Sequence, residues 1–128
     1  MQINFDNLVK ISRTISEQHR RTKLRCCHVS FLLKRNRIVS IGVNADKTHP
    51  FNSKFDYNPR KTGKCAELDC VLRSKLDSFA GHSMVVIRIN RENELAMSRP
   101  CIGCEHLIKS VGIENVWYTD VIGEFVKS

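Results

Sequence analysis

Four residues in two short motifs could carry out metal-dependent chemistry. Cys65 and Glu67 belong to a Cys-Ala-Glu motif, and Cys101 and Cys104 belong to a Pro-Cys-Ile-Gly-Cys motif. Thiolates are good ligands of Zn²⁺, and two residues three apart share one face of a helix. Three cysteine ligands would leave the fourth position of a tetrahedral zinc open to water, whose pKa the metal lowers to about 7. A carboxylate such as Glu67 could then move protons beside that water.

Spacing alone leaves other interpretations open. The pair Cys101 and Cys104 could be a redox dithiol, although a thioredoxin-type context near the start of the chain is absent. Residues two apart on a regular helix, such as Cys65 and Glu67, point about 200° apart, so their spacing does not by itself bring both to one metal. The motifs could also form a zinc-binding module without catalytic activity, although such a module has no need of Glu67.

The remaining cysteines and the histidines have simpler interpretations. Cys26 and Cys27 begin an apolar run, and Cys70 lies about 140° around a helix from Cys65, so we expect these three to be buried thiols. His106 follows the second motif by two residues and is the strongest alternative ligand. His106 and the other histidines outside the 44–64 segment are nevertheless expected to be surface or core residues.

The elements that must position these residues follow from the hydrophobic pattern. The first is a helix that Asn4 or Asp6 can cap and that runs to about Gln18. Residues 26–33 and 37–43 then read as two strands of a hairpin, with Asn36 suited to left-handed geometry in the turn. Gly42 indicates a bulge or a close approach of another backbone.

A segment without helical or strand periodicity follows, from residue 44 to residue 64. It contains five basic residues against two acidic ones, with three aromatic residues between them. Basic and aromatic residues together suit a surface that binds phosphate and stacks on a base. The alternative is that the aromatic side chains attach this segment to the body of the domain.

Regular structure resumes at Cys65, where a helical stripe extends to Phe79 and Gly81 provides a stop. Residues 83–90 read as a buried strand and 94–98 as an edge strand. Pro100 opens a helix over 101–110 that Gly112 ends. Residues 116–119 form a further strand, and the last residues add a fifth strand or a tail. This order predicts an α/β fold with a partly parallel sheet.

Composition limits the class of protein. The chain has 128 residues, 41% hydrophobic and 27% charged, which predicts one globular domain over residues 1–128. No secretory signal or membrane-spanning run is visible, so we expect a cytoplasmic protein with reduced thiols and no membrane partner. The net charge of +8 suggests phosphate-bearing partners, either a nucleotide or a nucleic acid, although the basic 19–25 segment could simply be a solvated surface.

The two motifs resemble the signature of the zinc-dependent cytidine/deoxycytidylate deaminase superfamily. C-A-E matches the first part of that signature, and S-R-P-C-I-G-C matches the second, P-C-x-x-C. The resemblance implies a three-layer α/β/α fold with a mixed five-stranded sheet and a homo-oligomer. It also implies one zinc ion per chain, held by Cys65, Cys101 and Cys104.

The resemblance also implies roles for individual residues. Glu67 would take a proton from water and pass it to the ring nitrogen and then to departing ammonia. The Ala66 N–H would bond the pyrimidine carbonyl, Asn44 would contact a sugar hydroxyl, and the Ser98 backbone would lie near the exocyclic amine. Lys47 and His49 are candidates for phosphate contacts by charge and loop position only.

The function implied is hydrolytic deamination of a cytosine-bearing nucleoside or nucleotide, such as cytidine, deoxycytidine or dCMP, to the uracil product and ammonia. Two alternatives are weighed beside it. One is deamination of cytosine or adenine in single-stranded nucleic acid or RNA, which requires an unstacked base. The other is the non-catalytic zinc-binding module.

Overall fold

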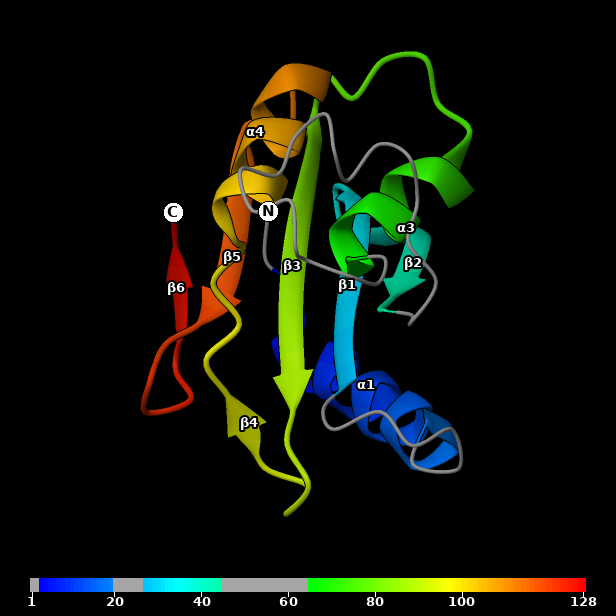
Figure 1. Cartoon of the computed structure of the whole chain (residues 1–128). Helices are drawn as coiled ribbons and strands as arrows, with labels where there is room; N and C mark the ends of the chain where they lie inside the picture. Colours follow the sequence, from blue (N-terminus) through cyan, green and yellow to red (C-terminus); the bar gives the residue numbers. More distant parts are fainter. Residues whose placement is uncertain (1–2, 20–26, 45–64) are drawn as a thin grey trace.

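The computed structural model describes residues 3–19, 27–44 and 65–128 (Figure 1). Several sequence-based expectations therefore lie outside the described residues. These are the burial of Cys26, the character of the basic stretch up to Arg25, the segment from residue 45 to residue 64, and the phosphate-contact roles of Lys47 and His49.

The described residues form three helices and six strands. The helices are α1 (Phe5–His19), α3 (Ala66–Ser74) and α4 (Ile102–Val111). The strands are β1 (Cys27–Lys34), β2 (Arg37–Val43), β3 (His82–Ile89), β4 (Leu95–Ala96), β5 (Asn115–Thr119) and β6 (Phe125–Lys127). The first helix begins as its sequence predicts, because the Asn4 side chain accepts a hydrogen bond from the Asn7 N–H at 3.1 Å.

The strands form one mixed sheet in the order β2-β1-β3-β5-β6, with the short β4 paired to β3. The strands β3 and β5 are parallel, and α4 lies in the crossover that connects them. All other strand pairs are antiparallel. The prediction of a mixed sheet in an α/β fold is confirmed, and β6 shows that the last residues add a strand. The sheet has six strands rather than the expected five, because the short β4 also pairs with β3.

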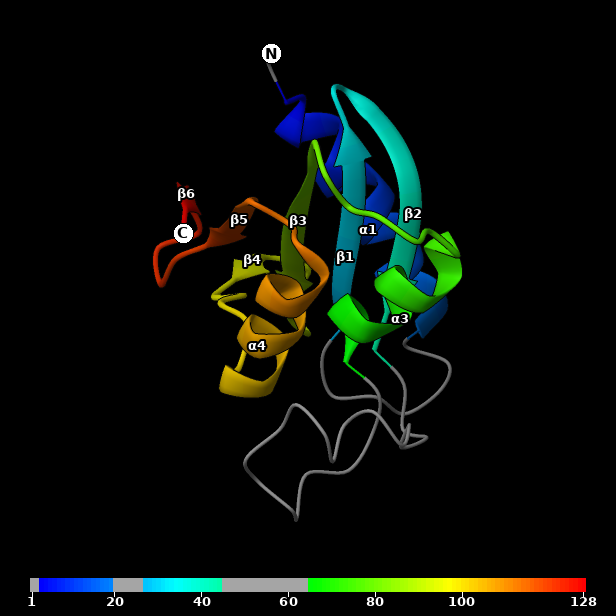
Figure 2. The ribbon, with the colours of Figure 1, turned by 90° about the horizontal axis from the view of Figure 1, so that it is seen from above.

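Helices cover both faces of the sheet, which gives three layers. Figure 2 shows α3 and α4 together on one face, with α1 behind β1 and β2 on the other. Alternate residues of β3 divide between the two interfaces: Val85 and Ile87 pack with Leu8 of α1, whereas Met84 and Val86 pack with residues of α3 and α4. The central strand is therefore buried on both faces.

Two local predictions are wrong in detail. The helix that begins at Ala66 ends at Ser74 rather than near Phe79, because Lys75 takes the left-handed conformation with φ of 55°. Phe79 is nevertheless buried, in the chain that leads to β3. In the β1–β2 turn, the residue with positive φ is Arg35, at 57°, rather than Asn36.

Gly112 ends α4 as expected, with φ of 88° and its N–H bonded to the carbonyl groups of Ile108 and Lys109. Within the described residues, no helix is both long enough and apolar enough to cross a membrane.

Candidate metal centre

Three cysteines from two helix N-termini converge on one face of the sheet. Cys65 directly precedes α3, Cys101 directly precedes α4, and Cys104 lies in the first turn of α4. Their sulfur atoms all lie within 4.8 Å of one another. Within the described residues, this is the only group of three or more metal-ligating side chains, so the convergence that the family resemblance implies is observed.

The two N-cap positions explain how the cysteines are held. The Cys65 carbonyl accepts the Asp69 N–H at 3.0 Å, and the Cys101 carbonyl accepts the Glu105 N–H at 2.9 Å. Each helix thus begins with a backbone bond to its cysteine, while neither cysteine side chain caps its helix. The positive end of each helix dipole therefore lies beside the sulfur atoms, where it favours thiolates.

Close packing of the thiols perturbs the ionisation of Cys104. Contacts with the thiols of Cys101 and Cys65, followed by burial, raise the pKa of Cys104. Negative charge on Glu67 acts in the same direction. Three thiolates this close repel one another, so the group is suited to a cation that compensates their charge.

Glu67 lies in the first turn of α3 and is only 4% exposed. Its Oε1 accepts a hydrogen bond from the Ser30 hydroxyl of β1 at 3.3 Å. Ser30 is completely buried, so this bond joins the helix to the central part of the sheet. The bond is a contact that the sequence analysis did not anticipate, because Ser30 has no distinctive spacing relative to the motifs.

Helix α3 lies very close to β2 because of Gly42. A Cβ atom at Gly42 would collide with the Ala66 carbonyl and the Cys70 N–H, and would lie 2.7 Å from the Cys70 Cα. The close approach predicted at Gly42 is thus confirmed. The one register shift of the β1–β2 ladder lies between Leu32 and Leu33 instead.

Side-chain hydrogen bonds also join β2 to α3. The Ser40 hydroxyl donates to the Cys70 carbonyl at 2.8 Å, and the Asp69 carboxylate accepts the Val43 N–H at 3.0 Å. Asp69 also pairs with Arg73 at 2.9 Å. These bonds fix the N-terminal turn of α3, and with it Cys65 and Glu67, relative to the sheet.

The segment that leads into α4 is fixed by Ser98. Its hydroxyl donates to the Val86 carbonyl at 2.6 Å, and it accepts the Thr119 N–H at 2.8 Å. The Ser98 N–H donates to the Thr119 carbonyl at 2.9 Å. Ser98 thus connects β3, β5 and the approach to Cys101.

Asn44 directly follows β2 and lies beside His28 of β1. The Asn44 side-chain oxygen accepts the His28 N–H at 3.0 Å, and the Asn44 N–H donates to the His28 carbonyl at 3.2 Å. These bonds continue the β1–β2 ladder and place Asn44 at the same end of the sheet as the N-terminus of α3.

Within the part of the chain that the structure describes, the remaining cysteines and histidines do not belong to the group. Cys27 and Cys70 are buried, as expected, and burial raises the pKa of Cys70 to about 12. The Cys70 thiol donates to the Ser40 carbonyl at 3.5 Å rather than joining Cys65. His106 is exposed and does not belong to the group, and His82 is a core residue whose Nδ1 lies 3.0 Å from the Ala80 carbonyl.

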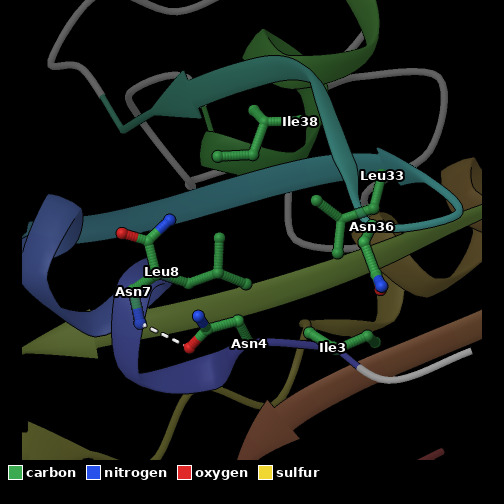
Figure 3. Close-up of a pocket in the computed structure, with 7 residues that line it drawn as sticks. All are labelled: Ile3, Asn4, Asn7, Leu8, Leu33, Asn36 and Ile38. Carbon is green, nitrogen blue, oxygen red and sulfur yellow. Dashed lines mark hydrogen bonds between the residues drawn. The ribbon is translucent and has the colours of Figure 1, made fainter.

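Two hollows are lined by residues other than the three cysteines. The smaller, of about 50 Å³, lies where the start of α1 meets the β1–β2 hairpin (Figure 3). It is lined by Ile3, Asn4, Asn7, Leu8, Leu33, Asn36 and Ile38. The larger, of about 390 Å³, lies between α4 and the C-terminal residue and mixes apolar side chains with both signs of charge.

Comparisons with known proteins bear on the fold. No family model matches the sequence, and no curated protein matches it. Among solved structures, the chain resembles the dCMP deaminase from the cyanophage S-TIM5, in its apo form and in complex with dCMP and dUMP. Both superpose with a TM-score of 0.51 and 15% identity over 90% of this chain, and over 84% and 82% of theirs respectively. The chain therefore has the three-layer fold of a dCMP deaminase, with a possible metal-binding group formed by the cysteines of its two motifs.

Proposed function

We propose that this chain is a zinc-dependent hydrolytic deaminase that converts a cytosine-bearing nucleoside or nucleotide to the uracil product and ammonia. One observation carries the proposal: Cys65, Cys101 and Cys104 converge within 4.8 Å at two helix N-termini, with the buried Glu67 in the first turn of one of them. A structural zinc site would not need a buried carboxylate beside an incomplete set of ligands.

The donor set fits zinc in number, type and spacing. Tetrahedral Zn–S bonds of about 2.3 Å place sulfur atoms roughly 3.8 Å apart. The observed limit of 4.8 Å needs only a small adjustment of side chains to reach that geometry. Cys104 is buried whereas Cys101 is exposed, so the group is reachable from one side.

The chemistry of the proposed reaction divides between the metal and Glu67. When bound, zinc would supply a nucleophilic water at neutral pH. Glu67 accepts a proton from the attacking water and delivers it to N3 of cytosine. Glu67 then transfers the second proton of the water to the exocyclic nitrogen. A C4–O bond forms, the bond from C4 to that nitrogen breaks, and ammonia leaves.

The support for Glu67 in this role is its position. The Ser30 hydroxyl donates to the Glu67 carboxylate at 3.3 Å, and both residues are buried. A proton carrier must keep its orientation while the proton moves, and a hydrogen bond from a fully buried serine provides that constraint.

Three residues of the described chain are proposed to contact the substrate. Ala66 is the first residue of α3, so its N–H has no acceptor within the helix and can donate to the pyrimidine carbonyl. The Ser98 N–H already donates to Thr119, so its carbonyl is the backbone group with the polarity to accept from the exocyclic amine. Asn44, held beside His28, is proposed to contact a sugar hydroxyl.

The test is an ammonia-release screen with zinc-loaded protein. The substrates are cytosine, cytidine, deoxycytidine, their monophosphates and a short single-stranded oligonucleotide. The proposal predicts release from at least one of the free nucleosides or nucleotides. Release from the oligonucleotide alone would favour nucleic-acid deamination, and no release from any substrate would contradict a deaminase.

A further inference from the structure

Arg88 of β3 lies on the same face of the sheet as the cysteine group. Met84 and Val86, which lie four and two residues before Arg88 on the same strand, pack against α3 and α4. Because side chains alternate between the faces of a sheet, Arg88 lies on that face as well. In the β1–β3 ladder, Ser30 pairs with Val86, and His28 pairs with Arg88. Arg88 is therefore one step along the strand from the serine that supports Glu67, about 7–8 Å away across the diagonal and within the reach of an arginine side chain.

The direction of that step is toward the helix N-termini. From Ser40 to Val43, β2 contacts first Cys70 and then Asp69, so α3 points its first turn toward the end of the sheet that bears Asn44 and His28. Ser98 leads into α4 from the same end, since its N–H donates to the carbonyl of Thr119, the last residue of β5, and β5 runs parallel to β3. Arg88 thus lies at the end of β3 nearest Cys65 and Cys101.

One N–H donor of the Arg88 guanidinium group, the Nε, has no hydrogen-bond partner among the described residues. This Nε is buried. The ion pairs found there join Asp69 to Arg73 and Glu105 to Arg99, not Glu67 to Arg88. A buried donor of a permanently charged group is costly to leave without a hydrogen bond. The position of this donor beside a candidate active site therefore indicates that a ligand accepts from it.

Phosphate is the ligand chemistry that fits best. An arginine presents a planar set of N–H donors that binds phosphate oxygens in pairs, and a partly desolvated arginine binds an oxyanion more strongly than an exposed one. We infer that Arg88 binds the 5′-phosphate of the substrate and thereby makes this chain select nucleoside monophosphates over nucleosides. This inference rests on the proposed function, because it assumes that the base occupies the space beside Glu67.

The test compares binding of dUMP and deoxyuridine to the zinc-loaded protein by calorimetry, which needs no turnover. The wild-type protein should bind dUMP more tightly. Arg88→Met should weaken dUMP binding about 10- to 100-fold and leave deoxyuridine binding unchanged. The matched control is Arg37→Met, which removes the same charge from an exposed site beside the β1–β2 turn, at the opposite end of the sheet, and should bind both ligands as the wild type does.

Arg88→Lys keeps the charge but loses the paired donors, so its affinity for dUMP should be intermediate; it also keeps the inference testable if the methionine variant does not fold. Equal wild-type affinity for the two ligands, or no dUMP binding, would overturn the inference. An Arg88→Met variant that loses zinc while its preference for dUMP persists would also overturn it, since Arg88 would then stabilise the thiolates of the metal site rather than bind phosphate. If the protein releases ammonia from nucleosides but does not bind dUMP more tightly than deoxyuridine, the proposed function stands and the inference is rejected. If the protein prefers dUMP through Arg88 but releases no ammonia from any substrate, the phosphate site stands and the proposed function is rejected.

Discussion

Single hydrogen bonds at the residue scale determine how the candidate site is held. The bond between Ser30 and Glu67 spans 37 positions of sequence and joins a strand to a helix. No spacing rule could have found it, because the contact depends on the register of β1 and on the depth at which α3 packs. The motif residues, in contrast, could be identified directly from the sequence, because Cys-Ala-Glu and Pro-Cys-Ile-Gly-Cys match the two parts of the deaminase signature.

Ser30→Ala should lower turnover about tenfold while leaving zinc content unchanged, because Glu67 would lose the donor that orients it. Steady-state kinetics with the best substrate from the ammonia-release screen measure this effect. Ser12→Ala is the control, since Ser12 is equally buried but donates to Leu8 in α1 on the other face. Equal losses of activity in both variants would indicate a general effect of destabilisation.

Cys70 provides a pH-dependent prediction at the same scale. Burial raises its pKa from 9.0 to about 12, so the folded state retains a proton that the unfolded state loses in this range. The stability due to the neutral thiol is complete below pH 9 and declines as the pH rises toward 12. Denaturant titrations should show the free-energy difference between the wild type and Cys70→Ala decreasing from pH 9 upward. A constant difference would contradict the buried neutral thiol.

Elements position the site through contacts that the sequence indicates only in part. The starts of α3 and α4 could be predicted because Cys65 and Cys101 precede helical stripes, and the end of α4 because Gly112 follows it. The end of α3 could not, since Lys75 has no intrinsic preference for its left-handed conformation and the apolar pattern continues to Phe79. Tertiary packing of Phe79 in the core outweighs the local helical pattern there.

Gly42→Ala tests the contact between β2 and α3. The added methyl would collide with backbone atoms of Ala66 and Cys70, which cannot move as a flexible side chain can. We expect a loss of about 1–3 kcal/mol in the free energy of unfolding, together with weaker zinc binding as α3 shifts. Val39→Ala on the same strand removes a side chain that is 39% exposed and should cost only about 0.5 kcal/mol. Wild-type stability in Gly42→Ala would show that the two elements are not in such close contact.

At the scale of the whole molecule, two helix N-termini lie on one face of a mixed sheet, and this arrangement links metal binding to folding. The parallel pair β3 and β5 requires a crossover, and α4 provides it while bringing Cys101 and Cys104 opposite Cys65. The alternation of elements could be predicted from the sequence. The convergence of three sulfur atoms could be expected only through the resemblance, because residue spacing does not fix the distance between two separate helices.

Cys104→Ser should lose zinc and lower the melting temperature together, because the ligands cluster fully only in the folded chain. Metal content and thermal unfolding of the same samples measure both effects. Cys70→Ala is the matched control: it should lose stability and keep its zinc, since Cys70 lies outside the group. Full zinc content in Cys104→Ser would reject the ligand assignment.

The central claim is that Glu67 moves protons beside a zinc ion held by three cysteines. Glu67→Gln tests it most directly, because glutamine keeps the shape of the side chain and an oxygen for the Ser30 hydrogen bond. Zinc content and ammonia release should be measured on the same purified samples of variant and wild type. The account predicts one zinc per chain in both and no turnover in the variant; turnover at the wild-type rate in Glu67→Gln would contradict it.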